Sequence, residues 1–196
     1  MNKELLTNNY LIVRNFISKS TVKEHADEFR QAYYSNFLKE DNQVPNSFIA
    51  YNPKLAKDLQ YEKCDDISSI IGSKVLPTYC FARMYKNRNV LKKHTDRPAC
   101  EISVTIHLSG DSSWPIWIKT PKGNDVSVDL QDGDAMIYLG CVAPHWRDMY
   151  FGNDYSQVFF HYVREEGVYS SHAYDKVQNL INQQHQILLK EYSNLL

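Results

Sequence analysis

The sequence predicts a mainly β domain, of sandwich or jelly-roll type, with helices before and after the sheets. About seven or eight short strand-like segments recur at regular spacing between residues 74 and 163. Aromatic residues make up 13% of the chain, with 14 Tyr, and aromatic side chains favour strands. Helical periodicity is confined to the segments on either side of this stretch.

The N-terminal part, about residues 1–73, is expected to be mostly helical. Thr21 and Glu24 have capping-box spacing, and apolar residues follow at helical intervals. Pro53 can open a helix, and Gly72 can end one. The expected elements are a strand at 10–13, a helix at 21–39, an extended piece at 48–51, and helices at 53–59 and 65–71.

The jelly-roll core is expected over about residues 74–163, and a C-terminal helix over about 172–195. Turn-forming residues separate the strands, as at Gly123 and Gly133. The apolar face of the last helix either packs on the barrel or forms a dimer, so monomer and homodimer both stay open. We find no repeat or linker, which predicts a single domain over 1–196. The expected core strands are 78–85, 90–96, 101–108, 114–119, 125–130, 135–139 and 155–163.

Composition gives no indication of nucleic acid or membrane partners. The formal net charge is -1, so no global attraction to polyanions is expected. No apolar run has the length of a signal peptide core or a membrane span. The four cysteines are far apart and form no CxxC motif. We therefore expect a reduced, cytoplasmic protein.

Two residues in the predicted strand 90–96 carry the chemistry. His94 and Asp96 are two positions apart, and a strand with period two would point both to one face. Two imidazoles and one carboxylate on one face of an octahedral iron leave the other positions open. A second histidine from a later strand, such as His145, would complete this facial triad.

The order of these motifs resembles that of the 2-oxoglutarate- and Fe(II)-dependent oxygenases. The similar pieces are residues 82–85, His94-Thr95-Asp96, Gly133-Asp134-Ala135 and Pro144-His145. The run from His94 to Ser103 looks most like the prolyl-hydroxylase-like branch, in its small microbial or phage members. The resemblance implies a double-stranded β-helix fold and Fe(II) bound by His94, Asp96 and His145. It also implies 2-oxoglutarate as cosubstrate, with ascorbate as a possible reductant.

The reaction implied by the resemblance is hydroxylation of an aliphatic carbon, with release of succinate and CO2. A peptidyl proline is the first expectation for the substrate, and a small molecule is the second. Three other histidines compete for the distal ligand place. We expect His107 and His161 to be pocket residues satisfied by neighbours and His172 to be solvated, since only His145 has the expected order.

One part of the family pattern is missing. The resemblance implies a cation about ten residues after the distal histidine, to pair with the distal carboxylate of 2-oxoglutarate. Residues 153–157 contain none. Arg83 is the first candidate to replace this cation, but an exposed surface position is an equally good interpretation of it. Arg97 and Arg147 are further candidates. Arg97 could equally pair with Glu101, and Arg147 could equally pair with Asp148. The candidate cosubstrate residues are Arg83, Tyr85, Arg97, Arg147, Tyr155 and Gln157.

Trp146 and Tyr79 are the candidates for contact with the substrate, and the polar loop at 42–52 is a candidate lid. Two rival interpretations remain open at this stage. One is a metal-binding, cupin-like jelly roll without catalysis, which the missing cation favours. The other is an interaction protein that uses its C-terminal helix.

Overall fold

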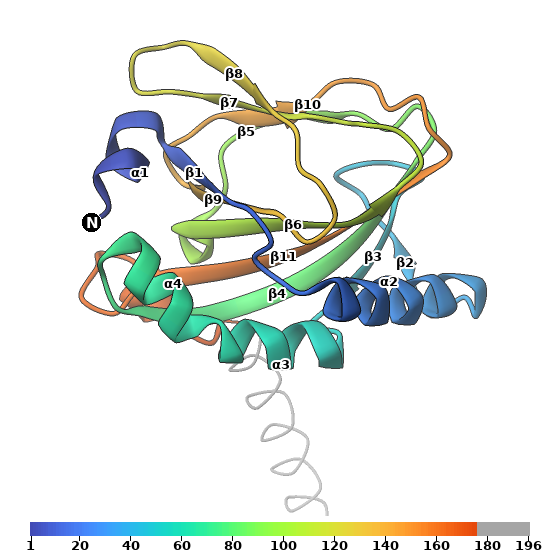
Figure 1. Ribbon diagram of the computed structural model, residues 1–196, viewed down its shortest axis with the longest axis horizontal. Coiled ribbons are helices and arrows are strands. Elements are labelled where there is room, and N and C mark those ends of the chain that lie inside the picture. Colours follow the sequence, from blue (N-terminus) through green and yellow to red (C-terminus); the bar gives the residue numbers. More distant parts are fainter. Residues whose placement is uncertain (176–196) are drawn as a thin grey trace, which may run out of the picture.

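Two antiparallel sheets face each other in the computed structural model, which describes residues 1–175 (Figure 1). The larger sheet has seven strands and the smaller has four. The larger sheet runs β1 (Tyr10–Val13), β9 (Ala135–Leu139), β6 (Ile102–Gly110), β11 (Asp154–Arg164), β4 (Val75–Lys86), β3 (Phe48–Tyr51), β2 (Lys39–Glu40). The smaller sheet runs β5 (Leu91–His94), β10 (His145–Arg147), β7 (Ile116–Lys119), β8 (Asp125–Val128). This arrangement confirms the predicted mainly β jelly roll.

Three helices, α2 (Lys19–Tyr34), α3 (Lys54–Glu62) and α4 (Cys64–Ile71), cover the outer face of the larger sheet, at the bottom of Figure 1. Helix α1 (Lys3–Asn8) lies beside β1 at the left, and short 3-10 turns are at Pro98–Cys100 and Ser170–His172. Buried aliphatic side chains fill the space between helices and sheet, including Ile67, Ile71, Val104, Ile106 and Val158. Burial of this apolar layer is the main contribution to stability.

The predicted helix at 21–39 is wrong at both ends. It begins at Lys19 because the Ser18 hydroxyl accepts a hydrogen bond from the Thr21 amide, which makes Ser18 the N-cap in place of Thr21. It ends at Tyr34, and the chain soon pairs as β2. Helix α1 was not expected at all, although the Asn2 side chain caps it. At six residues it is too short for a clear periodic signal.

The two faces of the larger sheet differ in chemistry because side chains alternate along each strand. On β11, Val158 and Phe160 face the aliphatic layer, whereas Phe159 and His161 face the smaller sheet. Register pairs Phe159 with Phe81 on β4 and with Thr105 on β6. The space between the sheets is therefore lined by aromatic and polar side chains.

Two strand predictions need correction. β5 ends at His94, so Asp96 lies after the strand rather than on it. β10 was missed because three residues carry no visible alternation. The predicted C-terminal helix lies, apart from its first residues, outside the described residues, so its packing and the single domain stay predictions. All four cysteines are free, and no helix within residues 1–175 could span a membrane.

Candidate metal centre and active-site pocket

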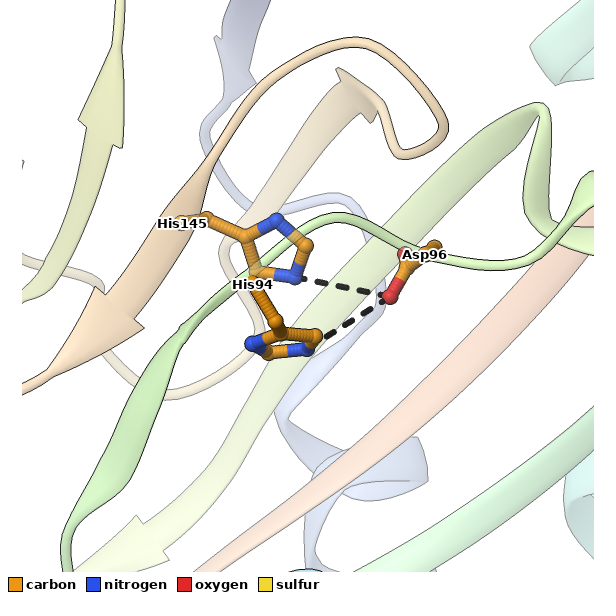
Figure 2. A group of neighbouring side chains, drawn as sticks. All are labelled: His94, Asp96 and His145. Carbon is orange, nitrogen blue, oxygen red and sulfur yellow. Dashed lines mark ion pairs between the residues drawn. The ribbon is translucent and has the colours of Figure 1, made fainter.

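His94, Asp96 and His145 come together at the mouth of the space between the sheets. β5 and β10 are neighbours, with His94 paired directly to His145. Figure 2 shows both imidazoles facing the Asp96 carboxylate. The Nε2 atoms of His94 and His145 each lie 3.6 Å from Asp96 Oδ1. Two ligand bonds of about 2.1 Å span at most about 4.2 Å, so one cation can contact all three atoms.

Hydrogen bonds determine which imidazole nitrogen carries the proton. His94 Nδ1 lies 2.8 Å from the Lys92 carbonyl oxygen, and His145 Nδ1 lies 2.9 Å from that of Ala143. A carbonyl only accepts, so each Nδ1 is the donor and each Nε2 keeps its lone pair. Burial also lowers the pKa of His145, which favours the neutral ring. Two lone pairs directed at a carboxylate repel it unless a cation lies between them, so the donor set fits a metal ion.

The second oxygen of Asp96 is also held. The Ser103 hydroxyl donates to Asp96 Oδ2 at 2.9 Å, and the Asp96 amide donates to the Gly140 carbonyl at 2.8 Å. A Cβ added at Gly140 would lie 2.5 Å from Asp96 Oδ2. The absence of a side chain at this position lets the β9 end approach the carboxylate. These contacts replace the strand geometry that the sequence suggested for aiming Asp96.

A cavity of about 280 Å³ adjoins the three residues. This is near the lower end of the volumes typical of small-molecule sites. Its wall includes aromatic side chains from the inner face of the larger sheet, two residues of the loop before β3, and three arginines. Besides the three candidate ligands, the lining residues include Asp41, Gln43, Tyr51, Tyr79, Phe81, Arg83, Arg97, Arg147, Phe159 and His161.

Arg83 is buried and already has an anionic partner. Its Nη2 lies 2.5 Å from Asp41 Oδ2 and donates to Gln43 Oε1 at 2.8 Å. Its Nη1 donates to the Tyr85 hydroxyl at 3.1 Å. Arg83 is therefore no surface cation, and its charge is compensated by the loop at 41–47. It fastens this loop against the cavity.

Arg147 is equally buried but has no anionic partner among the described residues. It lies two residues after His145 on β10, so its side chain enters the same interior. Its Nη1 donates to the Trp114 carbonyl oxygen, and it makes no ion pair with Asp148 within the described chain. Within residues 1–175 its Nε and Nη2 have no hydrogen-bond partner. A buried guanidinium without an anionic partner raises the free energy of the folded state unless a bound anion pairs with it.

Other incompletely bonded polar groups surround Arg147 at the deep end of the barrel. The Arg147 guanidinium lies 5.1 Å from the centre of the Tyr155 ring, which stacks on His107 at 4.3 Å. Gln157 pairs in register with His107, and both of its side-chain polar atoms lack partners within the described residues. Burial lowers the pKa of His107 to about 4, so its ring is neutral near pH 7. The region therefore offers the positive charge of Arg147 and several neutral polar groups, with the exposed Asp132 carboxylate 3.1 Å from His107 Nε2.

The remaining predicted site residues divide between the cavity and the outside. Tyr79 lines the cavity, and Arg97 lies above its ring at 4.5 Å. Arg97 pairs with Asp175 rather than with Glu101, which binds Arg164 instead. Trp146 was expected at the substrate mouth. The alternation on β10 places it on the opposite face, where it stacks on Trp117 at 6.0 Å, so this expectation is wrong.

Sequence reasoning expected His161 in a pocket but missed two sets of contacts in the site. Ser103 and His161 form a hydrogen-bonded pair beside Asp96, with Ser103 Oγ 3.0 Å from His161 Nδ1. Asp41 and Gln43 reach the cavity from a loop that the sequence suggested only as a lid. No local motif marks either feature, because each depends on long-range contacts.

Solved structures of similar fold include prolyl hydroxylases and a protein with nickel and 2-oxoglutarate bound. A prolyl-4-hydroxylase from Pseudomonas putida superposes with a TM-score of 0.69 at 13% identity, covering 82% of this chain and 95% of that one. A Trichoplax adhaerens prolyl hydroxylase, solved with a hypoxia inducible factor peptide, gives 0.67 at 16% identity, covering 83% and 87%. HygX from Streptomyces hygroscopicus, with nickel and 2-oxoglutarate bound, gives 0.68 at 11% identity, covering 85% and 88%.

The likeness defines the fold as that of the 2-oxoglutarate/Fe(II) oxygenases, including those of the prolyl-hydroxylase type. This confirms, at the level of the fold, the resemblance seen in the sequence. No protein-family model and no curated protein sequence matches this chain. The roles of individual residues are therefore argued from the geometry of this molecule.

Proposed function

We propose that this protein is an Fe(II)- and 2-oxoglutarate-dependent oxygenase in which His94, Asp96 and His145 bind the metal. One observation carries the proposal. The three ligand atoms and the uncompensated guanidinium of Arg147 line the same cavity. An anion that chelates the metal and carries a second carboxylate would bind the metal site and pair with the guanidinium at the same time, and 2-oxoglutarate has this chemistry.

Arg147 is the proposed partner of the distal carboxylate of 2-oxoglutarate. The resemblance places this cation on the last strand, about ten residues after the distal histidine, where Tyr155 stands. Arg147 reaches the space in front of Tyr155 from β10, in the facing sheet. Tyr155 and Gln157 would then contribute neutral hydrogen bonds. Arg83 is the weaker candidate because Asp41 already compensates its charge.

Bound iron would supply the oxidation of an aliphatic C–H bond to an alcohol by dioxygen, coupled to conversion of 2-oxoglutarate to succinate and CO2. The chain's own residues do the rest. Ser103 holds Asp96 in the orientation that ligation needs, and two backbone carbonyls fix the tautomers of the histidines. The loop fastened by Arg83 helps to exclude water from the cavity. Ascorbate would serve as a reductant for the metal.

The substrate is proposed to be a peptidyl proline or a small molecule. Structures of similar fold include a prolyl hydroxylase with a peptide and HygX with hygromycin B, so the fold admits both. The small cavity suits the cosubstrate and one small group of the substrate. The four free cysteines support a reducing, cytoplasmic location.

The test is formation of succinate from 2-oxoglutarate by the purified protein with Fe(II), ascorbate and air. We expect slow turnover without substrate, its loss on adding a chelator, and its absence in Asp96→Ala. The same variant should not retain stoichiometric metal. Metal binding by the wild type without any succinate would instead favour a cupin-like binding module.

A further inference from the structure

His161 presents an unused hydrogen-bond acceptor to the cavity. It lies on the inner face of β11 and is 3% exposed. Its Nε2 has no hydrogen-bond partner within residues 1–175. The ring lies against Tyr79 at 4.7 Å and Phe81 at 5.6 Å, both of which line the same cavity. The sequence led us to expect a histidine satisfied by its neighbours, and only one of its nitrogens is.

The hydrogen-bond chain determines which nitrogen is protonated. Ser103 Oγ contacts Asp96 Oδ2 at 2.9 Å, the Cys100 carbonyl oxygen at 3.3 Å and His161 Nδ1 at 3.0 Å. The carboxylate and the carbonyl can only accept, and the charged carboxylate is the strongest acceptor, so we assign the single hydroxyl proton to Asp96 Oδ2. His161 Nδ1 must then be the donor to Ser103. Nε2 therefore carries a lone pair and can only accept.

Flat aromatic side chains lie beside the His161 ring, and Arg83 and Arg97 line the same cavity. Phe81 stacks on Phe159 at 4.4 Å, and Tyr51 lies 5.8 Å from Phe81. The Tyr79 hydroxyl is occupied by the thiol of Cys100 at 3.2 Å. An isolated acceptor in an aromatic wall leaves a buried polar atom unsatisfied until a donor arrives. Such an arrangement selects a small ring or flat group that brings its own N–H or O–H.

His161 could instead be a metal ligand, because it forms a second possible cluster with Asp96 and Cys100. That cluster needs the Cys100 thiolate, and burial raises the pKa of this thiol, which disfavours ionisation. It also competes for Asp96 with two histidines whose lone pairs already face that carboxylate. The acceptor is therefore left for another ligand.

We propose that His161 is a specificity residue that accepts a hydrogen bond from the substrate, and that the substrate group entering the cavity is a compact ring carrying an N–H or O–H donor. This rests on the proposed oxygenase function and narrows its substrate class. Of the two substrates proposed above, this favours the small molecule, because the nitrogen of a prolyl residue within a peptide is a tertiary amide and its ring carries no donor. A free cyclic amine, a lactam or a hydroxyl-bearing ring fits.

The experiment compares two probes that differ in one donor, 2-pyrrolidinone and N-methyl-2-pyrrolidinone. Binding is followed by NMR titration of the full chain loaded with Zn(II) and 2-oxoglutarate, which requires no turnover. We expect 2-pyrrolidinone to bind the wild type about 3- to 10-fold more tightly, as one hydrogen bond implies. His161→Asn keeps an N–H for Ser103 but has no acceptor near Nε2, so it should lose this preference. His161→Gln can carry an oxygen toward the Nε2 position and should restore part of it.

Several results would overturn the inference. These are equal binding of the two probes to the wild type, binding of neither, or an unchanged preference in His161→Asn. Loss of Zn(II) by His161→Asn would identify His161 as a metal ligand and would also refute it. Failure of the oxygenase proposal has a different signature. The wild type would then form no succinate with Fe(II) under air, whatever the probes show.

Discussion

Replacement of Arg147 is the most direct test of how the cosubstrate is held. Arg147→Met keeps the length and apolar stem but removes the charge. Truncating one partner of a buried, hydrogen-bonded charge pair costs about 2–5 kcal/mol, and a central value of about 3 kcal/mol corresponds to roughly 150-fold in affinity. We therefore expect the KM for 2-oxoglutarate in substrate-free succinate formation to rise by about two orders of magnitude. The KM of Arg147→Lys should lie between those of the wild type and Arg147→Met, because an ammonium carries the charge but cannot form the bidentate hydrogen bonds of a guanidinium.

A binding assay without turnover checks the same magnitude. At 100 times its Kd, 2-oxoglutarate should stabilise the Zn(II)-loaded wild type by about 2.7 kcal/mol. For a chain of this length that is a rise in Tm of about 5–10 °C. The same concentration should shift the Tm of Arg147→Met by only about 1 °C. Without cosubstrate the variant should be no less stable than the wild type, because the lost guanidinium has no anionic partner within the described residues.

Controls separate this role from general effects of charge. Arg30→Gln removes an exposed cation that pairs only with Asp27 among the described residues, and it should leave the KM unchanged. Arg83→Gln tests the rival anchor, and we expect instability with a modest change in KM. The reasoning is refuted if Arg147→Met keeps the wild-type KM within about threefold while Arg83→Gln raises it strongly.

Three further changes probe the framework of the site. Asp41→Ala leaves the Arg83 guanidinium buried without its partner, so we expect a loss of about 3–5 kcal/mol in urea unfolding and faster proteolysis within the loop at 41–47; a loss below about 1 kcal/mol would contradict a buried ion pair. Gly140→Ala places a Cβ 2.5 Å from Asp96 Oδ2. Metal affinity, measured by competition with a chelator, should therefore fall at least tenfold. Unchanged affinity would mean that the carboxylate is free to move. His107 has a folded-state pKa of about 4 against 6.5 when unfolded, so its contribution to the free energy of unfolding is complete above pH 6.5 and is lost as pH falls toward 4. His107→Asn should flatten the pH dependence of stability in this range. An unchanged slope would assign this pH dependence to other groups.

The sequence was sufficient for the features that depend on local patterns. Strand periodicity and turn residues predicted the jelly roll, and β9 was predicted with its observed bounds. The residue types and their order identified His94, Asp96 and His145, which the structure brings together. The fold prediction succeeds because side-chain alternation is a property of short segments, and the metal-ligand assignment, which follows from residue type and order, remains a prediction.

The local signals failed where short segments are fixed by their neighbours. β10 has three residues and exists because β5 and β7 pair with it on either side. That pairing reversed the expected placement of Trp146 and directed Arg147 into the barrel. Asp96 is aimed by Ser103 and Gly140 rather than by the strand before it.

What the sequence alone determined about this protein is its fold class and three candidate metal ligands, which the fold brings within reach of one another. Only the tertiary structure decided which arginine is free to bind an anion. Arg83 and Arg147 are the same residue type, so the sequence does not distinguish them, and both are buried. Their difference is that Asp41, distant along the chain, compensates one charge, while no anionic group of the described chain reaches the other. Desolvation makes such a difference decisive, because a buried charge requires a partner, and the fold determines whether that partner is the protein or its ligand.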